Sequence, residues 1–279
     1  MLTKKNQEKL KVLKQTLQTE IDAVSMIYHL SFDDDGNVTS LLRRYRLVKN
    51  DKNFKWIGAV HEYLAVSGIL YDNDIAVSHL PVSHDRQRNL NIYQKRINAG
   101  EILSSRDIFY YANELVDHCK FEDAIHYYEA FLASNLGWIE DNIRACLKLA
   151  DCYAQLNQKE KMIAATLSTF TYDTPRPEAC CILGYYFMEK HKNHEAIYWY
   201  KQALQYKNND LMSFQNTSFS TWLPHLQLCV LYDRFKQFHK AYDHNECARK
   251  YKPKDPIILE NKEYFDRFLE NKGRNAENV

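Results

Sequence analysis

The residue types that could support chemistry gather in the first 80 positions of this 279-residue chain. The segment WIGAVHEYL, residues 56–64, places Trp56 close to the adjacent pair His61 and Glu62. A carboxylate partly enclosed by Trp56 and Tyr63 would have a raised pKa, which would suit Glu62 to accept a proton. Trp56 could stack on a sugar ring through its apolar face, or it could belong to a core.

Basic and imidazole groups occur on either side of this segment. Arg43, Arg44 and Arg46 lie within VTSLLRRYRLVK, where they could contact a diphosphate, although three arginines on a strand more often form a solvated face. His79 follows the last expected strand of this region. A neutral imidazole can bind ions such as Mn²⁺ beside carboxylates, and it can equally be packed at a strand end.

Other chemistries have no pattern to support them. The chain has only 7 glycines and no G-x-G-x-x-G or Walker sequence, which argues against a Rossmann or P-loop nucleotide site. No Ser/His/Asp or Cys/His arrangement has a plausible spacing. His191 and His194 are three residues apart but have no cysteine or carboxylate at ligand spacing, so we expect no zinc site.

Charge and composition exclude several classes of partner. With 37 basic and 36 acidic side chains, the net charge of +1 gives no electrostatic reason to expect nucleic acid or an anionic membrane. No run of apolar residues is long enough to span a bilayer, and no secretory signal is visible. The 7 cysteines form no C-x-x-C pair and mostly follow helical core spacing. We therefore expect reduced cysteines in a cytoplasmic protein.

The N-terminal part predicts a small α+β structure. We expect an amphipathic helix over 4–20, with Leu10, Val12, Leu13 and Leu17 as its apolar residues, and then strands over 24–30, 38–49 and 75–80. The sequence DDDGN at 33–37 predicts a turn between the first two strands. These strands are too few for an independent sheet, so the region should belong to something larger.

From about residue 106 the pattern is helical and repeats four times. The crossing position of each repeat carries a small residue: Ala112, Ala150, Gly184 and Cys229, spaced by 38, 34 and 45 residues. Aromatic residues three or four positions away would fill the space beside each crossing. These positions resemble the tetratricopeptide repeat, whose period is about 34 residues, so the other two junctions should carry longer loops, the last over 207–221.

Two further features belong to this solenoid. A final helix from Pro256 to about Asn271 should cap its apolar end. Aromatic doublets recur at helical spacing, and one ring of each should pack between helices while the other contacts a peptide in a groove. The doublets are Tyr110 and Tyr111, Tyr127 and Tyr128, Tyr185 and Tyr186, and Trp199 and Tyr200.

A family resemblance covers nearly the whole chain, from about residue 5 to residue 205. The strings RLVKNDKNFKWIGAVHEYL, DIAVSHL, RDIFYYANEL, EDNIRACLKLADCY and PRPEACCILGYYF, in this order, are similar to bacterial family-2 glycosyltransferases with a tetratricopeptide tail, among them sublancin-type peptide S-glycosyltransferases. The most specific string is W-x-G-x-V-H-E, Trp56 to Glu62, when this repeat follows it.

The resemblance implies roles for particular residues. Glu62 would be the catalytic base that faces the acceptor, Trp56, His61 and Arg46 would bind substrate, and His79 would bind the metal. A complete enzyme would use Mn²⁺ or Mg²⁺ with a nucleotide sugar. The family's donor-binding sheet and Asp-x-Asp motif would precede residue 1, so we expect no cofactor for this chain alone.

These observations predict a mainly α fold, a tetratricopeptide-like solenoid preceded by a small α+β remnant of a GT-A domain. The expected domains are 1–88 for the remnant, 89–272 for the solenoid and 273–279 for a frayed tail. Two functions follow. The chain is either glycosyltransferase-derived and inactive alone, with the solenoid holding a protein, peptide or glycan acceptor, or a non-catalytic interaction module. The expected partners are a protein or peptide in the groove, or a second copy in a homodimer.

Overall fold

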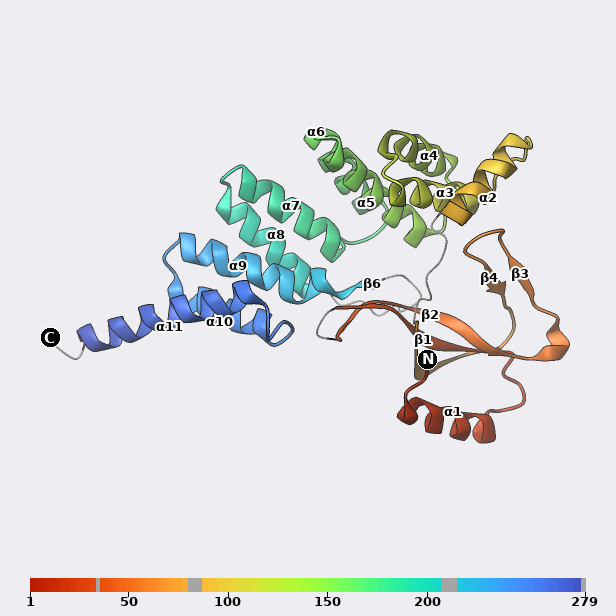
Figure 1. The fold of residues 1–279 in the computed structure, drawn as a ribbon, viewed down its shortest axis with the longest axis horizontal. Coiled ribbons are helices and arrows are strands. Elements are labelled where there is room, and N and C mark those ends of the chain that lie inside the picture. The colour runs from red at the N-terminus through yellow and green to blue at the C-terminus, as the bar shows by residue number, and fades with distance from the viewer. Residues whose placement is uncertain (34–35, 80–86, 207–214, 277–279) are drawn as a thin grey trace. The chain divides into compact units, whose positions relative to one another are not determined.

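The computed structural model describes residues 1–33, 36–79, 87–206 and 215–276, with the backbone alone at 215 and 269–276 (Figure 1). The chain divides into two compact units. Unit 1 comprises Met1–Ser31, Ser40–Tyr172 and Asp210–Gln215; unit 2 comprises Phe32–Thr39, Asp173–Asn209 and Asn216–Val279. The predicted boundary between residues 88 and 89 falls inside unit 1. The division into domains 1–88, 89–272 and 273–279 stays a prediction.

Unit 1 begins with the expected α+β segment. Its elements are α1 (Lys4–Thr16), β1 (Ala23–Phe32), β2 (Val38–Val48), β3 (Lys55–Ile57), β4 (Tyr63–Ala65) and β5 (Leu70–Ser78). The sheet has the strand order β5-β1-β2-β6, where β6 is the two-residue Gln215–Asn216, and β1 runs parallel to β5. The predicted strands are confirmed, although β5 begins five residues earlier than expected.

Helix α1 covers part of this sheet with a narrower apolar face than the sequence indicated. Leu13 is buried against Val24 and Ile75, and Leu10 packs at the edge of this cluster. Val12 is 56% exposed, so its assignment to the apolar face was wrong. Positions 10 and 13 lie on one side of a helix with 3.6 residues per turn, whereas position 12 points elsewhere.

The acidic segment after β1 forms the predicted turn. Asp33 accepts hydrogen bonds at its carboxylate from the Asn37 amide (2.8 Å) and at its carbonyl from Gly36 (2.9 Å). Burial disfavours the ionised carboxylate, but Lys252 and Asn37 outweigh burial and lower the pKa of Asp33 to about 2. Asp33 therefore forms an ion pair with Lys252. Residues 34 and 35 lie outside the described part.

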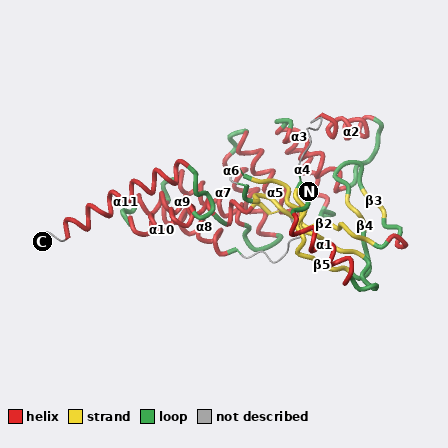
Figure 2. Tube along the Cα trace, turned by 60° about the horizontal axis from the view of Figure 1, so that its bottom comes forward, coloured by secondary structure: helices red, strands yellow, loops and turns green. Residues whose placement is uncertain are grey.

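The remaining helices form antiparallel pairs, as predicted (Figure 2). The pairs of unit 1 are α3 (Ser105–Asp117) with α4 (Phe121–Ser134) and α5 (Ile139–Gln155) with α6 (Lys159–Ser168); those of unit 2 are α7 (Pro177–Glu189) with α8 (Asn193–Gln205) and α9 (Trp222–Arg234) with α10 (Phe238–Arg249). Helix α2 (Gln87–Asn98) precedes the first pair and was not predicted as a separate helix.

Every pair turns through the same backbone motif. The second residue after the first helix has left-handed φ: Cys119 (56°), Asn157 (56°), His191 (57°) and Lys236 (58°). In the first pair the amide of Lys120 donates to the carbonyl of Leu115 (2.9 Å), and the same bond recurs in the other three. This is the Schellman arrangement. The turn residues are 38, 34 and 45 positions apart, which confirms the repeat register.

Small residues sit where the paired helices approach, as expected. Ala112, Ala150, Gly184 and Cys229 are buried. The tightest approach is at Gly184, where an added Cβ would lie 2.8–2.9 Å from ring carbons of Tyr200. Even one methyl group at position 184 would overlap this ring, so the aromatic side chain and the glycine depend on one another.

In three of the four aromatic doublets one ring is buried between helices, as expected; the contact of the other ring with a peptide stays a prediction. Tyr111, Tyr128 and Tyr200 are buried, and each neighbour is half-buried. The fourth doublet departs, because Tyr185 is 57% exposed while Tyr186 is half-buried. The cysteines are free, as predicted, and burial raises the pKa of Cys146 and Cys152 to about 11.

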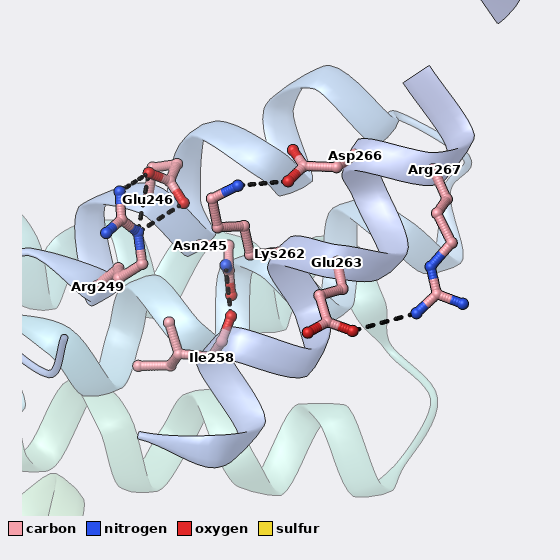
Figure 3. A network of polar contacts seen from close by, with 8 residues as sticks. All are labelled: Asn245, Glu246, Arg249, Ile258, Lys262, Glu263, Asp266 and Arg267. Atoms are coloured by element: carbon pink, nitrogen blue, oxygen red, sulfur yellow. Dashed lines mark hydrogen bonds and ion pairs between the residues drawn. The ribbon is translucent and has the colours of Figure 1, made fainter. Parts of the chain in front are cut away.

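Helix α11 (Pro256–Ala276) covers the last pair, with Ile258 and Phe265 fully buried. Asn245 donates a hydrogen bond from Nδ2 to the carbonyl of Ile258 (2.9 Å), which ties α10 to the start of α11 (Figure 3). The helix passes the expected end near Asn271. Of the expected tail, residues 277–279 lie outside the described part, and so do residues 207–214 of the predicted loop.

Two histidines meet between α9 and α10. His225 and His244 are half-buried, with their Nδ1 atoms 2.8 Å apart. The ring of Tyr232 stacks on His244 at 5.4 Å and 9°. One imidazole must donate and the other accept across this contact, so the fully protonated pair would face two donors toward each other.

The charges around this pair also oppose protonation. Burial lowers the pKa of His225, and Lys250 adds to the effect. Burial, His225 and Lys201 lower the pKa of His244 to about 4, against a smaller opposing contribution from Asp243. Unfolded histidine protonates near 6.5, so the unfolded state binds more protons between these values. The free energy of unfolding should therefore fall as the pH falls through this window.

We expect His244→Gln to flatten this pH dependence. Between pH 7 and pH 4.5 the variant should lose about 1–3 kcal/mol less unfolding free energy than the wild type, measured by urea unfolding at each pH. His239→Gln, at an exposed position of α10, is the matched control and should follow the wild type. An NMR titration in which His244 titrates near 6.5 would contradict the prediction.

Candidate functional site

The motif from Trp56 to Glu62 forms the turn of a two-stranded hairpin in unit 1. Strand β3 pairs antiparallel with β4, with Trp56 opposite Leu64 and Ile57 opposite Tyr63. Gly58 has φ +109°, which a residue with a side chain rarely adopts. Val60 is buried in the same core cluster as helices α3–α6. Because a two-stranded hairpin is marginal alone, this insertion is part of what orders it.

His61 anchors the hairpin turn to α3. It has left-handed φ (53°), and its Nε2 lies 2.8 Å from Oε1 of Glu114, which is 6% exposed. Asn89 of α2 donates to the same oxygen at 3.0 Å. Burial disfavours the ionised Glu114, but the hydrogen bonds from His61 and Asn89 outweigh burial and lower its pKa. The His61 ring also stacks on Tyr110 at 4.5 Å.

Arg106 makes the second set of contacts between α3 and the hairpin. Its guanidinium lies 4.6 Å from the ring centroids of both Tyr63 and Tyr110, within cation–π range. It donates to the carbonyl of His61 (3.3 Å) and lies 3.9 Å from the carboxylate of Asp141 on α5. The guanidinium of Arg106 therefore links Tyr63 of the hairpin to Tyr110 of α3.

The expected surroundings of Glu62 are not found. Trp56 is 62% exposed and Tyr63 is 41% exposed, so these rings do not enclose the carboxylate. The backbone carbonyl of Glu62 accepts from Arg44 at 3.4 Å, and its side chain is exposed. Of the two alternatives for Trp56, a place in a core is therefore excluded. The catalytic role of Glu62 stays a prediction.

Arg46 and His79, predicted separately, meet through Tyr28 of β1. The Arg46 guanidinium lies 4.5 Å from the Tyr28 ring centroid, and Nδ1 of His79 lies 2.8 Å from the phenol oxygen. Among the residues described, no three His, Cys, Asp or Glu side chains converge on a point that could hold a metal ion. The binding of a metal ion by His79 therefore stays a prediction.

The first helices of unit 1 carry exposed carboxylates in partly dehydrated surroundings. Asp117 at the end of α3 and Asp151 near the end of α5 reach solvent. Desolvation nevertheless raises the pKa of both, against the attraction of Lys148. A side chain that is exposed yet poorly hydrated lies on a surface that surrounding protein partly shields from water.

Sequence reasoning missed the residues that hold the hairpin. Arg106 and Glu114 lie within the string RDIFYYANEL, but the resemblance gave neither a role, and Asn89 lies outside every quoted string. The one usable signal is Glu114 itself, one position before Leu115 on the buried face of α3, where a carboxylate needs a partner. Periodicity shows that Glu114 is buried, but it does not identify His61 as the partner.

Comparison with known proteins identifies the fold. No protein-family model matches the sequence, and a search of curated proteins finds no match. The solved C-terminal part of a tetratricopeptide repeat-containing protein from Cytophaga hutchinsonii is similar, with 15% identity and a TM-score of 0.51 over 67% of this chain and 69% of that one.

Two further structures are more distant. MamA is 20% identical, with a TM-score of 0.41 over 60% of this chain and 96% of its own. YrrB, described as a TPR protein with an unusual peptide-binding site, is 12% identical, with a TM-score of 0.46 over 67% of this chain and 86% of its own.

The repeated turns, the small crossing residues and the Cytophaga similarity together define the class: this chain contains a tetratricopeptide-type helical solenoid. The glycosyltransferase resemblance finds no support among these structures. Within the described residues, no helix is long and apolar enough to span a membrane.

We expect His61→Ala to release the hairpin, because buried Glu114 keeps only Asn89 as a partner. The free energy of unfolding should fall by about 1–3 kcal/mol at pH 7. Amide hydrogen exchange in β3 and β4 should become faster. Since the pKa of Glu114 is lowered, its stabilising contribution is present above the unfolded value near 4.5 and is lost as the pH falls through the folded value.

Glu62→Gln is the matched control for this experiment, because its exposed side chain lies one residue away and makes no contact to α3. It should change stability by less than about 0.5 kcal/mol and leave hydrogen exchange unchanged. Equal effects of the two substitutions would show that the contact between His61 and Glu114 does not hold the hairpin.

Proposed function

We propose that this chain is a non-catalytic protein-binding scaffold in which the first helices of the repeat pairs hold a peptide or a partner helix. Repeat solenoids present extended surfaces of this kind, and binding to them needs no chemistry. The tetratricopeptide fold supports the proposal at the level of class.

The observation that carries the proposal is a set of exposed side chains on the first helices, Asp117, Asp151 and Tyr185. Asp117 and Asp151 reach solvent, and yet their ionisation is disfavoured. Carboxylates in such a position are unfavourable for the folded chain alone, whereas a cationic or hydrogen-bonding group of a partner would restore the lost hydration. Stability alone gives no reason to place them there.

Unit 2 carries an exposed aromatic side chain on the first helix of its own repeat pair. Tyr185 projects from the first helix α7 with 57% of its surface exposed. Exposed tyrosines often dominate the binding free energy of a peptide, because a rigid ring loses little entropy when it is buried. Tyr198, on the second helix α8 of the same pair, is 55% exposed and therefore provides a matched comparison.

We expect a peptide selected by phage display on the full chain to depend on the first helices. Tyr185→Ser should weaken its Kd by at least about tenfold, whereas Tyr198→Ser should change it less than about twofold. Asp151→Asn should weaken the binding of a basic peptide, and Asp123→Asn on the second helix α4 should not. Isothermal titration calorimetry measures all four values, with Glu62→Gln as a further control that leaves binding unchanged.

Equal losses for first-helix and second-helix variants would show that the first helices do not form the binding surface. Failure to select any peptide that binds more tightly than about 100 μM would count against the scaffold function itself.

The second candidate is that the chain derives from a glycosyltransferase and supplies its acceptor side. Two observations favour it: the parallel pairing of β1 with β5, and the meeting of Arg46 and His79 at Tyr28. In this proposal Glu62 deprotonates the acceptor, Trp56 and His61 contact the substrate, and a nucleotide sugar with Mn²⁺ or Mg²⁺ is held largely by another domain.

We expect hexose transfer to an acceptor peptide if this chain is combined with the donor-binding domain of a related enzyme, and mass spectrometry would detect the product. Glu62→Gln should then lower the rate by at least about 100-fold, as loss of a general base does. Transfer that survives this substitution, or a complete lack of transfer in a folded complex, would exclude the role given to Glu62.

A further inference from the structure

Two arginines in unit 1 share one phenol ring. The guanidinium of Arg46 lies 4.5 Å and that of Arg44 lies 5.8 Å from the ring centroid of Tyr28. A hydrogen bond between the Tyr28 hydroxyl and Nδ1 of His79, at 2.8 Å, helps to fix the ring. Two like charges are thereby brought to a single aromatic group.

Neither arginine has a counter-charge within the described residues. Arg44 donates from Nη1 to the carbonyl of Glu62 (3.4 Å), while its buried Nε has no acceptor. Arg46 is exposed and lies over the ring of Tyr28. A buried donor without an acceptor is unfavourable, and so is the approach of two cations without an anion.

The neighbouring arginine provides an internal comparison. Arg43 donates from Nη1 to Oγ of Ser25 (3.1 Å) and to the carbonyl of Asn73 (2.8 Å), so its position in the sheet is satisfied by the fold. Side chains alternate along a strand, so Arg44 and Arg46 lie on one face of β2 and Arg43 lies on the other. Of the two arginines that converge on Tyr28, Arg44 has one long hydrogen bond and an Nε without an acceptor, and Arg46 has no hydrogen bond to a described residue.

We propose that Arg44 and Arg46, on the platform of Tyr28, form a binding site for a phosphate group. A phosphate dianion carries enough charge for two guanidiniums and has oxygens to accept from the Nε of Arg44 as well as from the fork of Arg46. The phosphate can be free or carried on a serine side chain of a partner. The site does not depend on the scaffold function proposed above.

The test measures the Kd of the full chain for inorganic phosphate and for a blocked phosphoserine peptide by calorimetry, at one fixed ionic strength. We expect Arg46→Gln and Arg44→Gln each to weaken binding by at least about tenfold. Lys14→Gln, an exposed lysine on α1, removes the same charge away from the site and should change Kd less than about twofold. In NMR spectra, the Nε–H resonance of Arg44 should shift on binding.

Tighter binding of the phosphoserine peptide than of phosphate identifies a partner protein as the source, and the reverse order identifies free phosphate; both support the site. If Lys14→Gln weakens binding as much as the arginine variants do, the binding depends on overall charge and not on this site, and the proposal is overturned. Absence of binding by either probe below about 10 mM would also overturn it. If Arg44→Gln fails to fold, exposed Arg46→Gln still decides the result.

Discussion

The close approach of two helices within each repeat is the constraint on which the rest of the solenoid depends. At Gly184 the distance is set by the ring of Tyr200, and no side chain would fit between them. A pair packed this tightly needs a short, reproducible connection. The left-handed residue after each first helix, such as Cys119 or Lys236, provides it by closing the last turn with two hydrogen bonds.

The hairpin of unit 1 depends on a different interaction, a buried carboxylate. Glu114 would be unfavourable in the core of α3 without donors, and His61 supplies one from a segment more than 50 residues earlier. Arg106 makes a second contact to the hairpin, because its guanidinium lies over the ring of Tyr63. The motif that carries the family resemblance therefore has a structural task in this chain, whichever function it serves.

Local patterns predicted most of the repeat region. Small residues at Ala112, Ala150 and Gly184 and the aromatic rings beside them set the register, and the turns have the same spacing. The turns themselves gave no signal, because none of the four left-handed positions is glycine. Val12 was misassigned because an apolar residue one position off a helical face is common on a surface.

The sequence by itself determined the helices of the repeats, the strands β1 and β2 and the register of the repeats, because these follow from interactions between residues close in the chain. The tertiary structure alone decided which charges find partners. Asp33 pairs with Lys252, and Arg43 donates hydrogen bonds to Ser25 and Asn73, whereas Arg44 keeps a buried donor without an acceptor. The reason is that desolvation and ion pairing depend on distances between segments far apart in the chain, and no periodicity encodes these distances.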